Sequence, residues 1–526
     1  MDLKDKKLIF AFSLLIVCIV SYLIFAQHYD PFFDAHLTLS KYTIEENYLA
    51  YRPFDTEERG DMQIQVNNIS TKFGLTLLLS ILSLVSGMSL ELFPLFPLGI
   101  LILFLVNLIF IRKLFQSEVY STPVILSSLF ILLEISFICS IYNLNTHAWG
   151  FFIFLVILYL ILDCFYTSFT VKKIIALALF MLTLSTIYYS LQFALILFLL
   201  FFSLTVLVFR GHKDSKIYLI SLLFALLVIL FSFSDDFFKN VLSNFFLNSN
   251  NFKLYFENFI LNIIKSINIF DGSYTSVITS YQLESYNNVS LFFGFIYYFV
   301  LFFIVSLYLI RTLKNYLRTR TILVLDRVFI SLIFTSILHF LLYLYFNQFV
   351  TYLILFFFSI ISIYFIFNYL PKKKILFGIL VVLVLLKLIS GFYLDPNYDR
   401  SDYRFYSSEV VWACENIPLN DSQVITDLYF GEKLIYCNYD LKVYGFYYLN
   451  EDANNIDIYY ESDADLSSYN NRQTYLVMTT LNTEVKVPLF YGISSLIKPF
   501  ESNLNDNTGL NKIYSSNLGS IYWFGG

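Results

Sequence analysis

The chain has 526 residues, of which 58% are hydrophobic, 20% are aromatic and only 14% are charged, and its formal net charge is −5. Soluble domains carry about 25% charged residues, so this composition excludes an ordinary soluble enzyme. No basic stripe indicates a nucleic acid partner. Runs such as 98–111 and 193–209 contain almost no charge, and several runs approach the length of about 20 residues that crosses a bilayer core. The sequence therefore predicts a multi-pass helical membrane protein.

The first apolar run, 8–26, predicts a retained membrane anchor. It is longer than the core of a signal peptide, and no small-residue cleavage site follows it. Asp30 and Pro31 stand there instead. Placing the lysines before this run in the cytoplasm puts the next loop outside the cell membrane.

The later charges agree with this orientation. Inward connections carry basic residues, for example at 112–113, 172–173 and 311–327, whereas the outward connections 143–148 and 347–350 carry no Lys or Arg. This is the positive-inside distribution, and it places the N-terminus in the cytoplasm and the C-terminus outside. The predicted spans are 8–26, 94–111, 120–142, 149–167, 174–190, 191–209, 217–234, 291–310, 328–346, 350–370 and 375–393.

Three polar segments lie outside the membrane in this topology, next to a bundle that covers 1–393. The first exterior loop, 27–93, contains the apolar run 73–85, which is too short for a span and is interpreted as a juxtamembrane or re-entrant helix. The second exterior loop covers 235–290. Residues 394–526 are numerous enough to bury a small core of their own.

The C-terminal segment alternates helical and extended patterns, which predicts an extracytoplasmic α/β domain. Cys414 and Cys437 lie in it, 23 positions apart, in a compartment that permits disulfides. The sequence is consistent with a disulfide between them and also with two free buried thiols. The expected elements are a helix in 402–417, a strand at 422–427, a helix at 430–437, strands at 441–446 and 474–480, and a hairpin over 512–524.

The first exterior loop contains the strongest candidates for chemistry, Asp34 and His36. Asp34 lies shortly beyond the first span, near the lipid headgroups, where a carboxylate could accept a proton from a hydroxyl or help to hold a divalent cation. It could equally be a solvated loop residue or a helix N-cap. His36 could share a proton with Asp34 or contact a phosphate. Asp30 is a candidate substrate contact, although the following Pro31 favours a turn role.

Basic residues are the candidates for binding a phosphate. Arg52 and Arg59 lie in the same loop, where a guanidinium could bind phosphate in a bidentate manner, but each has acidic neighbours that could pair with it. Lys387, in the last span, could reach a lipid phosphate, extend to the interface, or pair with Glu134. Ionisable residues inside spans are costly and are therefore functional candidates. Asp163, near the cytoplasmic end of its span, and His339 complete this group.

The order of these parts resembles the type C glycosyltransferases, integral membrane enzymes that use polyprenyl-phosphate-linked sugars. Asp34-Ala-His36-Leu-Thr-Leu is similar to the acidic loop after the first span of that family, and 72–87 is similar to its juxtamembrane helix ending in glycine. The segment 409–427 is similar to the start of the exterior domain in many prokaryotic members. There are departures: no Trp-Trp-Asp motif occurs in the C-terminal domain, and Asn347-Gln348 stands where many relatives have an arginine.

The resemblance implies a glycosyltransferase of the cell membrane. The donor would be a polyprenyl-phosphate-linked sugar, and the acceptor a glycan, lipid or protein on the extracytoplasmic face. Asp34 would act as the base or as the acid that positions a metal. The resemblance leaves a divalent cation, Mg²⁺ or Mn²⁺, open as a cofactor, and no set of metal ligands is assigned. The alternative hypothesis is a non-enzymatic protein, either a flippase for lipid-linked glycans or a component of surface assembly.

Overall fold

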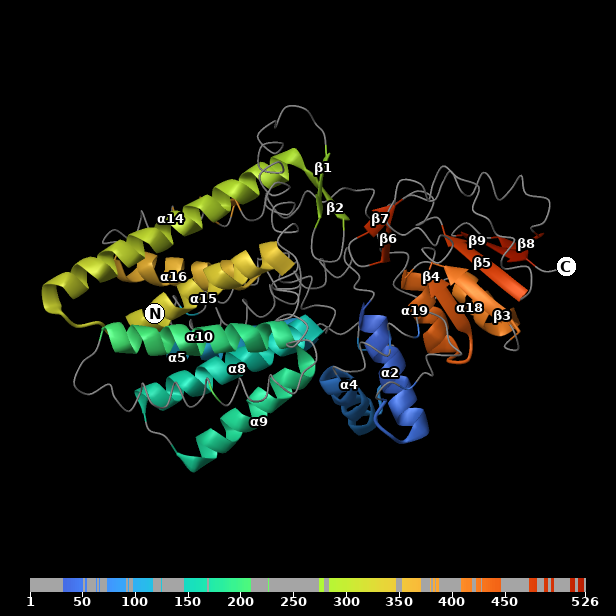
Figure 1. Cartoon of the computed structure of the whole chain (residues 1–526), viewed down its shortest axis with the longest axis horizontal. Coiled ribbons are helices and arrows are strands. Elements are labelled where there is room, and N and C mark those ends of the chain that lie inside the picture. Colours follow the sequence, from blue (N-terminus) through green and yellow to red (C-terminus); the bar gives the residue numbers. More distant parts are fainter. Residues whose placement is uncertain are drawn as a thin grey trace, which may run out of the picture. The chain divides into compact units, whose positions relative to one another are not determined.

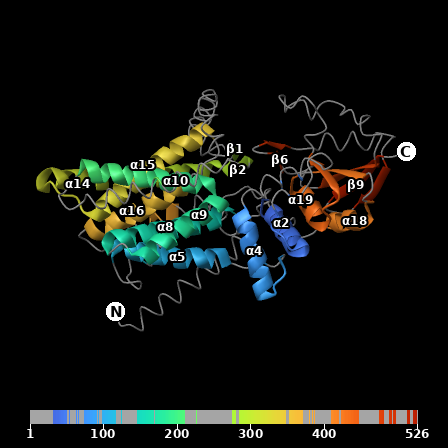
Figure 2. The ribbon, with the colours of Figure 1, turned by 60° about the horizontal axis from the view of Figure 1, so that its bottom comes forward.

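The protein is described by a computed structural model that covers most of the predicted helices and strands. Figure 1 and Figure 2 show them from two directions. The described residues are 32–50, 73–90, 98–116, 146–167, 170–209, 274–278, 283–346, 352–369, 408–418, 422–426, 428–445, 473–479, 487–490, 493–495, 511–515 and 519–524, together with isolated residues such as Gln63 and Val66.

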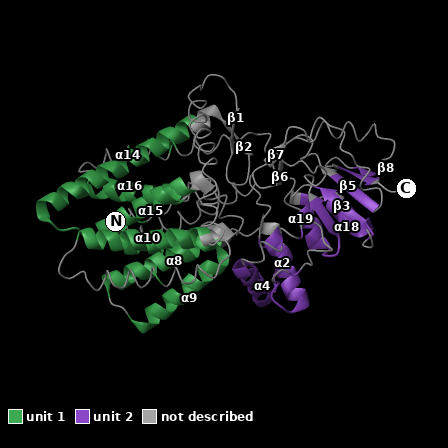
Figure 3. Cartoon of the chain, in the orientation of Figure 1, with its two compact units in different colours: residues 1–25, 96–275, 286–394 green, residues 26–95, 276–285, 395–526 purple. Residues whose placement is uncertain are grey.

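The chain divides into two compact units (Figure 3). The helical unit comprises residues 1–25, 96–275 and 286–394, and the mixed unit comprises residues 26–95, 276–285 and 395–526. The segment 26–95, which follows the first predicted span, therefore groups with the C-terminal residues.

The helical unit consists of long apolar helices. Among the described residues, four helical segments are long and apolar enough to cross a membrane: Trp149–Tyr166, Ser190–Val208, Phe292–Thr319 and Val324–Leu342. The helices of this unit are α5 (Leu98–Phe115), α8 (Thr146–Tyr166), α9 (Val171–Ile187), α10 (Tyr189–Val208), α14 (Asn288–Thr319), α15 (Val324–Phe346) and α16 (Tyr352–Tyr369).

Each of these helices overlaps a predicted span, and most of their ends lie one to four residues from the predicted boundary. The break between α9 and α10 falls at Tyr188, whose φ of −152° and ψ of 107° are extended, whereas the sequence placed it at 190–191. Helix α14 continues nine residues past the predicted end of the span at residue 310. Its 32 residues extend about 48 Å, more than the hydrocarbon core, because the polar stretch from Arg311 to Thr319 forms helix as readily as the apolar one. The predicted span 8–26 lies outside the described residues, and so do nearly all of 120–142 and 217–234 and most of 375–393.

The basic connections gather at one end of the helical unit. The last turn of α5 and the first turn of α9 meet there through ion pairs of Lys113 and Lys173 with Asp163. Arg327, near the start of α15, donates a hydrogen bond of 2.9 Å to the carbonyl oxygen of Phe209, which follows α10. This clustering agrees with the same-side placement that the sequence predicted. The assignment of that side to the cytoplasm stays a prediction.

The mixed unit contains a five-stranded sheet in the order β4-β3-β5-β9-β8. Strands β4, β3 and β5 are parallel, and β9 and β8 add antiparallel to one edge. The strands are β3 (Ser422–Thr426), β4 (Lys442–Gly445), β5 (Gln473–Thr479), β8 (Asn511–Ser515) and β9 (Gly519–Phe524), and the C-terminal helices are α18 (Ser408–Asn416) and α19 (Leu428–Cys437).

These elements confirm the α/β prediction for the C-terminal residues. Every strand and helix expected in 402–524 is present, and α19 forms the crossover between the parallel strands β3 and β4. Cys414 of α18 and Cys437 of α19 form a disulfide with a Cα–Cα distance of 6.1 Å. Two short hairpins that the sequence did not predict also occur, β1 (Tyr274–Ile278) with β2 (Leu283–Asn287) and β6 (Val487–Phe490) with β7 (Ile493–Ser495).

Two helices from the first exterior loop complete the mixed unit, α2 (Phe32–Glu46) and α4 (Phe73–Ser86). They lie side by side in Figure 2. Ala35 and Leu39 of α2 belong to the same buried apolar cluster as Val424 of β3 and Leu434 of α19. The core of the C-terminal domain is therefore built partly from residues almost 400 positions earlier in the chain.

Candidate functional site

The candidate site is the N-terminal end of α2, where Asp34 is the third residue of the helix. Because α2 begins at Phe32, Asp34 is neither a loop residue nor the N-cap, which corrects both alternative interpretations. The first turn of a helix has backbone N–H groups without intrahelical partners and carries a partial positive charge. Both features favour the ionised form of a carboxylate at this position.

His36, two residues further along α2, is buried, with 2% of its surface exposed. Its Nδ1 lies 3.4 Å from Oγ1 of Thr76 on α4. Positions i and i+2 of a helix do not face each other, so α2 does not bring His36 and Asp34 together. Burial lowers the pKa of His36 from 6.5 to about 4, so the imidazole is neutral at physiological pH.

Small hydroxyl side chains join α2 to α4. Ser40 Oγ donates a hydrogen bond to the carbonyl oxygen of His36 at 2.7 Å and also lies 3.1 Å from the carbonyl oxygen of Thr76. Ser80 of α4 lies 3.4 Å from the carbonyl oxygen of Ser40. Because these groups are buried, their hydrogen bonds avoid the cost of unpaired polar atoms and fix the position of α2 against α4. Helix α4 ends at Ser86, and the φ of +68° at the following Gly87 suits a glycine that terminates a helix.

The outward face of α4 is apolar. Leu77, Ile81, Leu84 and Val85 are all exposed, whereas Leu75, Thr76, Leu79 and Ser80 are buried. The helix therefore presents Thr76 and Ser80 to α2 and a row of apolar side chains outward. This arrangement suits a helix beside a bilayer surface, as the sequence predicted for 73–85.

The opposite side of α2 is attached to α19. Lys41 Nζ donates a hydrogen bond of 2.8 Å to the carbonyl oxygen of Tyr436 and lies 4.7 Å from the centre of the Tyr436 ring. The hydroxyl of Tyr439 donates to Glu45 at 3.1 Å. Burial, together with the nearby charge of Glu45, raises the pKa of Tyr439. An ammonium group close to a ring and a carbonyl oxygen forms a directional anchor, so α2 is held from two sides.

A further residue of the first exterior loop, Gln63, bonds to the edge of the sheet. Its amide Nε2 donates to the carbonyl oxygen of Leu441, and its Oε1 accepts from the backbone N–H of Val443 at 3.3 Å. Gln63 is fully buried, so it supplies partners that the edge strand β4 would otherwise lack. The roles of Lys41, Gln63 and Tyr439 were not predicted from the sequence, because the partner of each lies almost 400 positions away in the chain.

The other predicted site residues are placed as follows. His339 is buried within α15, where its Nε2 lies 3.2 Å from Ser190 Oγ and 3.1 Å from the Ser190 carbonyl oxygen. Asp163 forms ion pairs with two lysines. Asp30, Arg52, Arg59, Glu134 and Lys387 lie outside the described residues, as does Asn347-Gln348.

Comparison with solved structures identifies the fold. ArnT from Cupriavidus metallidurans, in the apo state, matches with a TM-score of 0.51 and 9% sequence identity, covering 98% of this chain and 97% of ArnT. ArnT is a type C glycosyltransferase. The chain has the type C glycosyltransferase fold. The resemblance predicted from the sequence is thereby confirmed for the fold.

The type C fold is also represented by the oligosaccharyltransferase AglB from Archaeoglobus fulgidus. Its complex with an inhibitory peptide and a dolichol-phosphate matches with a TM-score of 0.47 and 13% identity, covering 89% of this chain and 69% of AglB. Another AglB structure contains Zn and sulfate. No family model matches the chain. No curated protein matches it either.

Proposed function

We propose that this protein is a membrane glycosyltransferase, which transfers a sugar from a polyprenyl-phosphate-linked donor to a cell-surface glycan, lipid or protein on the extracytoplasmic face. The observation that carries the proposal is a type C fold along nearly the whole chain, together with a carboxylate in the first turn of α2. A fold alone does not establish an activity, so the argument depends on that carboxylate.

Asp34 is the proposed catalytic base. A base must be ionised before it can accept a proton from the acceptor hydroxyl, and the N-terminal turn of α2 favours that form. The helix is also held rigidly, because α4 and α19 pack on its two sides. A fixed carboxylate loses less entropy when the hydroxyl must be aligned for attack on the sugar.

We propose that His36 helps to hold α2 against α4 and takes no part in proton transfer. It is buried against Thr76, and its lowered pKa keeps it neutral, so it does not supply a proton at physiological pH. Arg52, Arg59 and Lys387 remain the proposed ligands of the donor phosphate, with Asp30 as a further substrate contact. Within the described part of the chain no group of three His, Cys, Asp or Glu side chains could hold a metal, so no step is assigned to Mg²⁺ or Mn²⁺.

The proposal is tested with Asp34→Asn in a membrane assay of transfer from a polyprenyl-phosphate sugar. Loss of a general base lowers the rate by about 10²- to 10⁴-fold, and that loss is the expected result. The matched control is Glu46→Gln, which makes the same chemical change at the exposed end of the same helix. Full transfer by a normally expressed Asp34→Asn protein would remove Asp34 from the mechanism. No transfer by the original chain would favour the flippase or surface-assembly alternative.

A further inference from the structure

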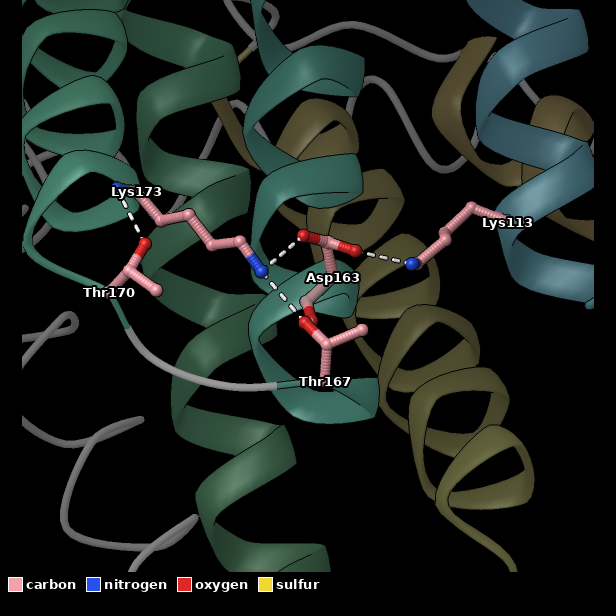
Figure 4. Close-up of polar contacts among 5 residues, drawn as sticks. All are labelled: Lys113, Asp163, Thr167, Thr170 and Lys173. Atoms are coloured by element: carbon pink, nitrogen blue, oxygen red, sulfur yellow. Dashed lines mark hydrogen bonds and ion pairs between the residues drawn. The ribbon is translucent and has the colours of Figure 1, made fainter.

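The ends of α5, α8 and α9 form a compact polar cluster within the helical unit. Asp163 of α8 lies between two lysines, Lys113 of α5 and Lys173 of α9, which approach its carboxylate from opposite sides (Figure 4). Lys173 Nζ lies 2.5 Å from Asp163 Oδ2 and donates a hydrogen bond of 2.7 Å to Thr167 Oγ1. One carboxylate thus positions two ammonium groups at the junction of three helices.

The cluster carries excess positive charge. Arg112 and Lys172 are exposed and adjoin the two paired lysines in the chain, so these helix ends carry four basic side chains and one acid. The paired lysines are themselves 23% exposed, which leaves them within reach of a ligand. The positive-inside rule requires only that basic residues lie somewhere in these connections, and it does not require their side chains to be held in place. Here two of them are held in place by Asp163.

An exposed apolar stripe leads away from the cluster. Val171, Ile175, Leu179 and Leu182 follow one another along one side of α9, and all four are exposed. The spacing of three or four residues places them on one helix face. In a membrane-spanning unit an exposed apolar face contacts lipid chains, so this stripe and the basic cluster together match a molecule with an acyl chain and an anionic headgroup.

We propose that Arg112, Lys113, Lys172 and Lys173 bind the phosphate-bearing headgroup of an anionic phospholipid of the bilayer, whose acyl chain lies along the exposed face of α9. The proposal concerns the end of the bundle predicted to be cytoplasmic. It does not depend on the glycosyltransferase activity. Each lysine or arginine close to a lipid phosphate strengthens binding by about 5-fold.

The test uses the purified full chain in detergent, with dimyristoylphosphatidylglycerol as the anionic probe and dimyristoylphosphatidylcholine as the zwitterionic one. Binding is measured by native mass spectrometry. The variant R112Q/K172Q removes two exposed charges and leaves the ion pairs of Asp163 intact. We expect it to bind phosphatidylglycerol about 25-fold more weakly than the original chain, with no change for phosphatidylcholine.

The matched control is K314Q/R318Q, which removes two exposed charges from the polar end of α14. It is expected to bind phosphatidylglycerol as the original chain does. Equal losses in both variants would show a diffuse charge effect and overturn the proposal. The proposal would also fail if inorganic phosphate at the same concentration displaced the lipid completely, because the site would then recognise a free anion only.

Discussion

The burial of His36 makes the stability of the α2–α4 pair depend on pH. Its pKa is about 4 in the folded protein, because burial opposes the charged form, and 6.5 in an exposed state. The unfolded segment therefore binds a proton at higher pH than the folded one. The contribution of neutral His36 is fully present above pH 6.5, falls as the pH drops from 6.5 to 4, and is constant below 4.

The size of the effect follows from the shift. A difference of one pKa unit corresponds to 1.36 kcal/mol, so the full loss between pH 6.5 and pH 4 is about 3 kcal/mol. At pH 5.0 the loss is about 2 kcal/mol relative to pH 7.5. The comparison variant is His36→Asn, whose side-chain amide reaches about as far as Nδ1 of histidine but does not titrate in this range.

Hydrogen–deuterium exchange of the α2 backbone amides in the intact protein is the assay, because it reports local opening in a chain with two units. After correction for the intrinsic exchange rate, the protection of α2 should fall about 30-fold between pH 7.5 and pH 5.0 in the original chain, as the 2 kcal/mol requires. In His36→Asn that additional fall should vanish. Amides of α10 in the helical unit are the internal control, and they should behave alike in both proteins. An equal pH dependence of α2 in the two proteins would refute the reasoning.

Three other perturbations test the packing. Replacing Cys414 and Cys437 by serine removes a cross-link over 23 positions and should lower the stability of the C-terminal domain by about 3 kcal/mol, read from the denaturation midpoint; an unchanged midpoint would contradict this. Gln63→Ala leaves two backbone groups unpaired, the carbonyl oxygen of Leu441 and the N–H of Val443 in β4. This should cost about 2 kcal/mol or more and speed amide exchange in β4, and the β9 amides serve as the reference. Asp163→Asn removes the acid between two lysines, so the lysines repel each other and the thermal unfolding temperature of the helical unit should fall. Adding Lys113→Met removes that repulsion and should recover part of the loss. No recovery would show that charge repulsion is not the cause.

Some features of the fold are properties of local sequence. Apolar runs of sufficient length became α8, α10, α14 and α15, because a bilayer core requires every backbone group to bond within its own segment. The alternation of strand and helix patterns in 422–524 became a sheet with a crossover helix. The uneven placement of lysine and arginine predicted that the basic ends of α5 and α9 lie on the same side of the bundle, which agrees with their shared ion pairs to Asp163.

The candidate site was predicted in part from the local sequence and was described in full only by the structure. The sequence singled out Asp34 and His36 as neighbours, since they share one short motif. Helix formation from Phe32 separated them, because two residues along a helix correspond to a turn of about 200°. The shared motif therefore did not indicate that His36 is buried against α4.

Sequence alone determined that this chain is a membrane protein with a C-terminal α/β domain, because those properties follow from hydrophobic length and local periodicity. Only the tertiary structure decided that α2 shares the core of that domain, that Lys41 reaches Tyr436 across 395 positions, and that one carboxylate joins three helices. Such contacts depend on which surfaces meet after folding. No periodicity along the chain records the partner of a side chain hundreds of residues away.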